Sequence, residues 1–472
     1  MTNFLTGVSG LTSNLYSAAL GGSKFLMDMP ILATTTEVEA DEAIVVAGVL
    51  LSLIVIYLAS KIGGEICVKI NLPPVLGDLV GGVIVGVSAL KLLAFYEPGD
   101  ESATSLIMNL LEKTTRLEPE AIAATFQAQS EVITIFSELG VIILLFEIGL
   151  ESELKELIKY GPQAAIVAVV GVIAPFSAGT LGLVYIFHTP LIPAIFAGAA
   201  LTATSIGITA KVLAELGLLS AKEGQIIIGA AVLDDILGII VLAVVASLVK
   251  TGEVEVTNII YLIVSSGVFL VGAILLGRFL APYYVNLVKN LKTRGPLLIS
   301  ALIIAFFLSY VGAAIQLEAI LGAFTAGLVL GETELQKELE EQVVPVADFF
   351  VPIFFVVVGA RTNLGVLNPS VPSNREGLII ATFLITVAII GKVVAGFTVL
   401  QEQTNRLGIG VGMIPRGEVG LVFAGVGAAS GALSDSLQAA IIMMVILTTF
   451  ISPPLLRVVF REVVSEPEKV EG

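Results

Sequence analysis

The chain has 472 residues, of which 56% are hydrophobic and only 14% are charged, whereas a soluble domain carries about 25% charged residues. The formal net charge of −16 argues against nucleic acid as a partner. The single cysteine, Cys67, excludes an internal disulfide and a cysteine-ligated metal cluster. Long apolar runs instead predict an all-α polytopic membrane protein, because a helix satisfies its own backbone hydrogen bonds in lipid.

Residues 1–41 form an N-terminal extension ahead of the apolar runs. Apolar side chains recur there at helical spacing among Ser, Thr and Asn, namely Phe4, Val8, Leu11, Leu15 and Ala19. This pattern is typical of an amphipathic helix at the membrane interface, and a poorly ordered tail is the alternative. The stretch lacks the basic start and apolar centre of a signal peptide.

Thirteen apolar segments then follow, and we interpret each as a transmembrane helix. Their predicted ranges are 43–68, 73–90, 131–150, 162–187, 190–217, 224–249, 257–287, 296–313, 317–331, 344–361, 377–400, 407–428 and 435–458. Residues 43–460 are thus expected to form one transmembrane unit. The acidic loop at 92–130 and the charged tail at 461–472 are expected to lie outside the membrane.

The basic residues predict the orientation of these spans. Lysine and arginine are more numerous in the short loops on one side, which include Lys61, Lys155, Lys211, Lys289 and Arg406. Because basic loops stay in the cytoplasm, the C-terminus is expected to be cytoplasmic. An odd number of spans then places the N-terminus outside.

The sequence also contains an internal repeat. PVLGDLVGGVIVGVSAL at 74–90 resembles EAILGAFTAGLVLG at 318–331, and the spans that follow these two also pair. The second and third spans therefore correspond to the ninth and tenth. An offset of seven spans is odd, so the two halves insert in opposite directions. Inverted repeats of this kind are a signature of secondary transporters.

The same offset pairs the fifth span with the twelfth, and both are interrupted near mid-depth. Thr202, Ala203, Thr204 and Ser205 interrupt the fifth span, and the sequence Pro-Arg-Gly-Glu at 415–418 interrupts the twelfth. Proline removes a backbone donor and breaks the helical hydrogen-bond ladder. Two broken helices at corresponding positions of the repeats are the best sequence indication of a transport site.

Adjacent carboxylates lie within the sixth span. Asp234 and Asp235 are about a dozen ångströms into the apolar run 226–249, at roughly 1.5 Å per residue. A charge at that depth costs about 2.5 to 3.5 kcal/mol, and such residues mark ion or proton pathways. Asp235 is the first choice for the ion carrier, because one carboxylate can hold a proton or a cation but not both. The alternative is a structural pair of carboxylates.

Three further groups accompany the carboxylates. Lys392 lies within the run 378–400, and a buried lysine needs a carboxylate partner, so we predict an ion pair with Asp234. Cation binding would break this pair and release a proton, and the alternative is a permanent tether between two helices. Thr204 and Ser205 offer hydroxyl and freed carbonyl oxygens, which suit Na⁺, unless their hydroxyls bond back to their own helix.

Other charged residues also lie within spans. Arg416 and Glu418 are expected to support the broken twelfth span as an internal or cross-helix pair. Glu147 is either a second protonatable group or a residue near the cytoplasmic end of its span. The sequence around it is compatible with both interpretations. The sequence shows no nucleophile motif and no phosphate-binding loop that would indicate an enzyme.

These motifs together resemble the monovalent cation/proton antiporter family, in its NapA-like and Kef-like branch. The resemblance covers residues from about 45 to 460. Among its motifs are LPPVLGDLVGGVIVG at 72–86, ALTATSIGITAKVLAELG at 200–217, GAAVLDDILGIIVLAVV at 229–245 and GMIPRGEVGLVFAGVG at 412–427. It implies an NhaA/NapA-like fold of about 13 transmembrane helices, with two inverted repeats and crossed discontinuous helices.

The resemblance also implies how the protein works. A homodimer is implied, with a mobile core domain formed in part by residues of about 131–249 and 344–458, and a dimerisation domain formed by the remainder. The family's Na⁺ ligands correspond to Asp235, Asp234 and Thr204, and its coupling lysine to Lys392. NhaA-like members have an acidic residue where this chain has Ser205, so a third carboxylate ligand is in question. The Asp-Asp form implies electrogenic exchange.

The expected function is secondary active antiport of Na⁺, or Li⁺, for H⁺ by alternating access, without a cofactor. The alternatives are a K⁺/H⁺ antiporter on the same scaffold and a cation channel. A bacterial inner membrane is the expected location, and a thylakoid or organelle membrane is the alternative.

Overall fold

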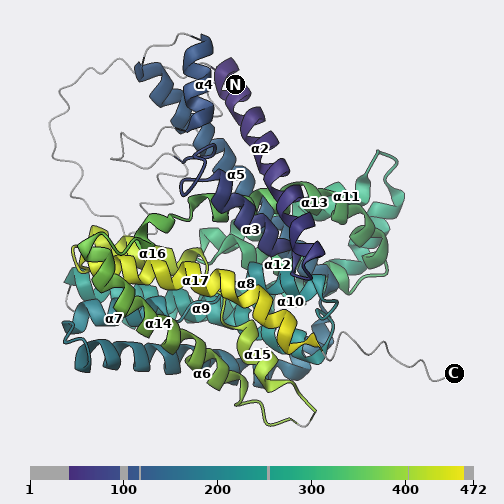
Figure 1. Ribbon diagram of the computed structural model, residues 1–472. Helices are drawn as coiled ribbons and strands as arrows, with labels where there is room; N and C mark the ends of the chain where they lie inside the picture. Colours follow the sequence, from purple (N-terminus) through teal and green to yellow (C-terminus); the bar gives the residue numbers. More distant parts are fainter. Residues whose placement is uncertain (1–41, 96–104, 116–118, 252–255, 402, 462–472) are drawn as a thin grey trace. The chain divides into compact units, whose positions relative to one another are not determined.

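The computed structural model describes residues 42–95, 105–115, 119–251, 256–401 and 403–461. The predicted N-terminal extension and nearly all of the C-terminal tail lie outside this range. Every regular element within the described ranges is helical (Figure 1). The prediction of an all-α fold is therefore confirmed.

Nine of the described helices are long and apolar enough to span a membrane. They are α2 (Glu42–Lys69), α5 (Pro119–Glu151), α6 (Leu154–Tyr185), α9 (Lys222–Thr251), α10 (Val256–Asn290), α11 (Pro296–Ala314), α13 (Gln336–Arg361), α14 (Pro372–Gly396) and α17 (Asp435–Val459). The chain is therefore a multi-pass integral membrane protein.

Four further spans of the prediction are short or broken. The short ones are α3 (Pro74–Val85) and α12 (Ala319–Gly331). The two broken spans consist of α7 (Leu191–Ala200) with α8 (Ile206–Glu215), and of α15 (Arg406–Gly412) with α16 (Glu418–Ala429). With the nine long helices these account for all thirteen predicted spans in the described part of the chain, which confirms the predicted number.

The structure differs from the prediction in the segment 92–130. Part of this presumed loop is the helix α4 (Leu106–Thr115), and α5 begins at Pro119 rather than near residue 131. Polar and apolar residues mix along LIMNLLEKTT, so no continuous apolar run marks α4. A further short 3₁₀ helix, η2 (Leu364–Leu367), follows α13.

Helix packing repeats with the predicted offset of seven spans. The contact of α3 with α13 corresponds to that of α12 with α5, and the contact of α6 with α9 corresponds to that of α14 with α17. Glycine allows the close approach in both halves. A Cβ on Gly82 would lie 2.2 Å from the Val356 carbonyl oxygen, and one on Gly327 would lie 2.3 Å from the Phe146 carbonyl oxygen. The inverted repeat is thus present in the packing.

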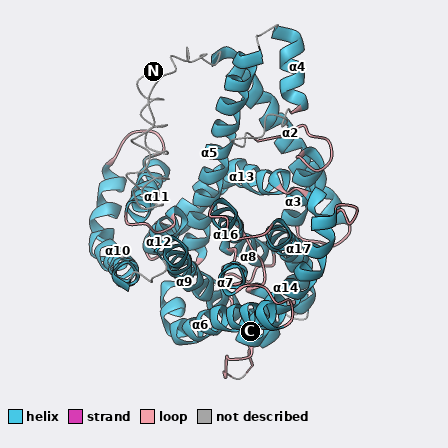
Figure 2. Cartoon of the chain, turned by 90° about the vertical axis from the view of Figure 1, so that its left-hand side faces the viewer, coloured by secondary structure: helices cyan, strands magenta, loops and turns pink. Residues whose placement is uncertain are grey.

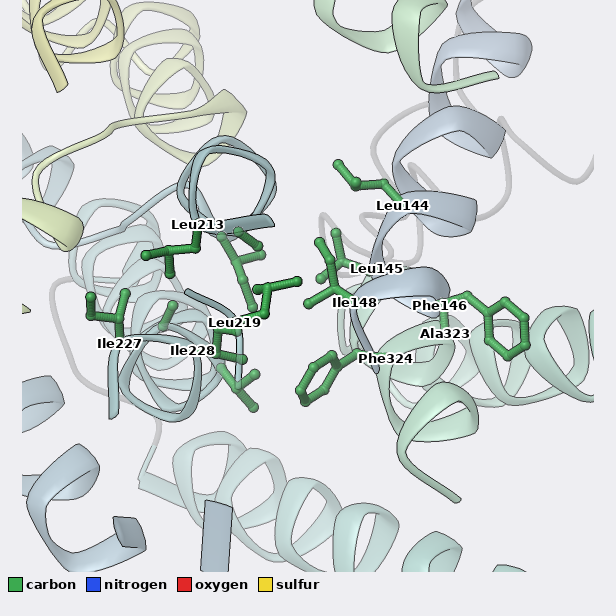
Figure 3. Packing of buried hydrophobic residues seen from close by; sticks show 14 of the residues in the cluster. Leu144, Leu145, Phe146, Ile148, Leu213, Leu219, Ile227, Ile228, Ala323 and Phe324 are labelled. Carbon is green, nitrogen blue, oxygen red and sulfur yellow. The ribbon is translucent and has the colours of Figure 1, made fainter. Parts of the chain in front are cut away.

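The spans fall into two packing groups. The eight-helix group comprises α6, α7, α8, α9, α14, α15, α16 and α17, and the flanking group comprises α2, α3, α5, α10, α11, α12 and α13. In Figure 2, α8 and α16 lie between α5 and α13 on one side and α6 and α14 on the other. Buried aliphatic side chains fill the boundary. Figure 3 shows Leu145 and Ile148 of α5 facing Leu219, which follows α8.

Candidate ion-binding site

The two broken spans meet at their interruptions. The backbone N–H of Ser205 donates to the Pro415 carbonyl oxygen at 2.8 Å. The Thr204 hydroxyl donates to the carbonyl oxygen of Met413 at 3.1 Å. These bonds use backbone groups that each break frees from its own helix, so the two breaks stabilise one another.

The local sequence explains why the chain breaks there. Pro415 has no backbone donor, and it lies between the end of α15 and the start of α16. A Cβ on Gly417 would lie 3.0 Å from the Ser205 Oγ, so glycine lets the second break lie against the first. The Thr209 hydroxyl, one turn into α8, donates to the Gly412 carbonyl oxygen at 2.7 Å. The hydroxyls of Thr204 and Thr209 thus bond across to the twelfth span, whereas the Thr202 hydroxyl donates back to the Ala199 carbonyl oxygen of its own span at 2.8 Å.

Arg416 is completely buried at this crossing. Its Nη1 donates to the carbonyl oxygen of Thr202 at 3.0 Å and also to that of Ala203. Because the C-terminal end of a helix carries partial negative charge, the guanidinium stabilises the end of α7. The Thr449 hydroxyl donates to the Arg416 carbonyl oxygen at 2.5 Å. Glu418 is the first residue of α16, but its side chain lies outside the described part of the structure.

Asp234 and Lys392 form an ion pair between α9 and α14. The Lys392 Nζ lies 3.1 Å from both carboxylate oxygens of Asp234, and both side chains are 0% exposed. This is the contact expected from the sequence. Gly171 of α6 provides the space, because a Cβ there would lie 3.3 Å from the Lys392 Nζ.

Asp235 faces a different environment from its neighbour. Consecutive residues on a helix point in different directions, and Asp235 lines a small cavity together with Thr204 and Ser205. The centre of a water molecule can occupy a volume of about 20 Å³ in this cavity. The cavity therefore has room for about one water molecule. Asp234 is therefore held by lysine, whereas Asp235 borders a space that a small ion can enter.

Glu147 lies on α5, six residues beyond Val141, which lines the cavity. Six helical residues span about 9 Å, and Lys211, Glu151 and Glu340 are among its electrostatic neighbours. It therefore lies toward the C-terminal end of α5. Two residues of the site were not predicted from the sequence. Gly171 lies beside Lys392, and Glu318 also lines the cavity.

Comparison with known families identifies the chain. The family described as "Sodium/hydrogen exchanger, transmembrane" matches residues 49–462. The chain belongs to the sodium/hydrogen exchanger family. This exchanger is 67% identical over 444 residues to the high-affinity Na⁺/H⁺ antiporter NhaS3 of Synechocystis, with 93% of this chain and 96% of the relative covered.

More distant relatives match most of the chain. The exchanger is 32% identical to the Na⁺/H⁺-K⁺ antiporter GerN of Bacillus cereus, over 86% of this chain and 94% of the relative. Its fold is similar to that of the sodium proton antiporter MjNhaP1 from Methanocaldococcus jannaschii, with a TM-score of 0.58 at 15% identity. That comparison covers 89% of this chain and 98% of the other, and it confirms the antiporter fold with crossed discontinuous helices.

Proposed function

We propose that the chain is a secondary active antiporter that exchanges Na⁺, or Li⁺, for H⁺ by alternating access. The observation that carries this proposal is the cavity lined by Asp235, Thr204 and Ser205 at the crossing of two broken helices. Na⁺ prefers oxygen ligands, and broken helices supply them as hydroxyls and freed carbonyls. The names of the relatives NhaS3 and GerN agree with this substrate.

Asp235 is the proposed carrier, and it holds either Na⁺ or H⁺. Thr204 and Ser205 supply further oxygens to the ion. Asp234 also attracts the cation when it enters, and this weakens its pairing with Lys392. A buried ammonium without its carboxylate is an uncompensated charge, and loss of its proton removes that cost.

This sequence of events predicts the stoichiometry. Na⁺ displaces one proton from Asp235 and a second from Lys392. Two protons then cross for each Na⁺, so the exchange moves net charge and is electrogenic. A permanent tether at Lys392 would instead give electroneutral exchange. No enzymatic step and no cofactor enters this mechanism, and Arg416 and Glu418 serve to support the broken twelfth span.

We assign the moving unit to the core-domain helices, within residues of about 131–249 and 344–458. The eight-helix group is the best candidate for this unit, because both broken spans and both partners of the Asp234–Lys392 pair belong to it. The remainder, including α10 and α11, then forms the dimerisation domain of a homodimer. An apolar boundary such as that of Leu145 and Ile148 offers few polar contacts that resist sliding.

The proposed orientation places the C-terminus in the cytoplasm and the N-terminus outside, because basic loops stay inside. The proposed location is a bacterial inner membrane, with a thylakoid or organelle membrane as the alternative. K⁺/H⁺ antiport on the same scaffold is the second candidate, and GerN, whose name includes K⁺, is the specific observation that favours it.

The test is exchange by purified protein in liposomes that contain a pH dye. An acid-inside gradient is imposed, and Na⁺, Li⁺ or K⁺ is added outside. We expect Na⁺ to raise the internal pH with the wild type and with Glu131→Gln, which removes an exposed carboxylate of α5. Asp235→Asn should show no exchange while it remains folded.

Three results would change the assignment. Normal exchange by Asp235→Asn would refute the site. A response to K⁺ alone would establish the K⁺/H⁺ alternative. Cation flux that ignores the pH gradient would indicate a channel. An imposed membrane potential should change the Na⁺-dependent rate if exchange is electrogenic.

A further inference from the structure

The cavity beside Asp235 has a second acidic residue in its wall. Glu318 and Ile320, at the start of α12, line the cavity together with Asp235, Thr204 and Ser205. Glu318 and Asp235 are the two carboxylates among the lining residues of the described structure. The second carboxylate comes from a part of the sequence more than eighty residues from the paired aspartates.

These two carboxylates belong to different packing groups. Asp235 lies on α9, which packs on α6 in the eight-helix group. Glu318 precedes α12, which packs on α5, α10 and α11 in the flanking group. Val141 of α5 and Phe354 of α13 complete the flanking wall of the cavity. Movement of one group past the other would therefore change the distance between Glu318 and Asp235.

A tight turn fixes the position of Glu318. Gln316 adopts a left-handed conformation, with φ of 68°, which is uncommon for a residue other than glycine. The next N–H, of Leu317, donates to the Gly312 carbonyl oxygen at 3.0 Å, and the Leu317 side chain is only 5% exposed. The chain thus turns directly from α11 into α12, which holds the Glu318 carboxylate against the cavity rather than on a long loop.

An exposed carboxylate lies one turn from the same cavity. Glu138 lies one turn before Val141 on α5, and it is exposed. A charge facing lipid within a span would cost about 2.5 to 3.5 kcal/mol, so the exposed face of Glu138 borders water. α5 and α12 are both odd-numbered spans and run in the same direction. We therefore expect ions to reach the cavity from the membrane face at which both helices begin.

We infer that Glu318 is a cation-binding residue of the exchange site in one access state only. In the state that the structure represents, Glu318 and Asp235 attract a monovalent cation from opposite walls of the cavity. When the eight-helix group moves, Asp235 carries the ion away and Glu318 stays with the flanking group. This inference rests on the proposed antiport, and it adds an asymmetry between the two sides of the membrane.

The asymmetry can be measured as a difference in apparent KM. Removal of one negative charge close to the ion should raise the apparent KM by about 3- to 30-fold, depending on how well water screens it. Glu318→Gln should show this increase when Na⁺ is supplied on the face where α5 and α12 begin. The KM from the opposite face and the maximal rate should stay within about twofold of the wild type, since Glu318 does not contact the ion there.

The experiment uses full-length protein in liposomes of uniform orientation, with Na⁺ titrated from each face in turn. Glu318→Asp keeps the charge and should give an intermediate KM from the face where α5 and α12 begin. If Glu318→Gln does not fold, the KM of Glu318→Asp from each face tests the inference instead. Glu131→Gln is the matched control, because it removes an exposed carboxylate from the N-terminal half of α5, which begins at the same membrane face as α12. Its KM should match the wild type from both faces.

The possible results separate this inference from the proposed function. An unchanged KM, an equal rise from both faces, or a lower maximal rate alone would overturn the inference. The last result would indicate that Glu318 only stabilises the N-terminus of α12. Wild-type protein that exchanges no cation would overturn both the proposed function and the inference.

Discussion

Replacement of Lys392 by alanine tests the ion pair most directly. The substitution leaves the Asp234 carboxylate at 0% exposure without the ammonium that lies 3.1 Å away. At an effective dielectric constant of about 20, two unit charges at this distance attract by about 5 kcal/mol. Breaking a buried pair by removing one partner typically costs about 3 to 5 kcal/mol. We therefore expect Lys392→Ala to lower the free energy of unfolding by about 3 to 5 kcal/mol.

The assay is a double-mutant cycle with Asp234→Asn, measured by denaturation of purified protein in detergent. Removal of both charges should cost less than the sum of the two single changes, because no buried charge is left alone. The loss in Lys392→Ala should also shrink as the pH falls, since a protonated Asp234 carries no charge. A coupling energy below about 0.5 kcal/mol, or a loss that does not depend on pH, would refute this reasoning.

The same variant separates a proton carrier from a tether. If Lys392 releases a proton in each cycle, a folded Lys392→Ala protein should still exchange Na⁺ for H⁺ but one for one. Its rate should then no longer respond to an imposed membrane potential. Electrogenic exchange by this variant would show that Lys392 does not carry a transported proton.

Two further predictions concern the space and the oxygens around the ion. Gly171→Ala should move Lys392 and lower stability by about 1 to 3 kcal/mol through overpacking. Gly161→Ala on the same helix meets nothing within 4 Å, so it should leave stability unchanged or raise it by up to about 1 kcal/mol, because alanine is a better helix former than glycine. Melting curves of the two variants make this comparison, and equal curves would contradict it. Thr204→Val should raise the KM for Na⁺ by roughly 10-fold through loss of an oxygen ligand. Thr209→Val should lower stability without a change in KM, because Thr209 does not line the cavity.

Long apolar runs made the spans predictable from the sequence, because the bilayer demands them. The short spans α3 and α12 were predicted from their apolar runs, and their match to one another in the repeat supported both. The extra helix α4 was missed, since its apolar residues are interspersed with Asn, Glu and Lys. The start of α5 was predicted about a dozen residues too late for the same reason: its first turns are mixed in polarity.

The candidate site was predictable where burial leaves few choices. A lysine in an apolar run needs a carboxylate, and Asp234 and Asp235 were the only carboxylates placed to meet it in their span. Sequence could not show that Arg416 would bond to the carbonyls of Thr202 and Ala203, because every residue has a carbonyl and only the fold shows which ones are freed. Glu318 was missed because it stands at the end of a span, where a charged residue is ordinary.

The geometry of the cavity suggests why exchange would be coupled. A space for about one water molecule cannot hydrate a bare carboxylate fully, so closing it against Val141 and Phe354 would strip water from Asp235. A bound proton or Na⁺ removes most of that cost, and the site should then move mainly in a loaded state. An Asp235→Asn site is neutral at all times, so it can move empty. It should therefore lose exchange without losing the ability to change conformation, and limited proteolysis or crosslinking between the two helix groups can measure that difference.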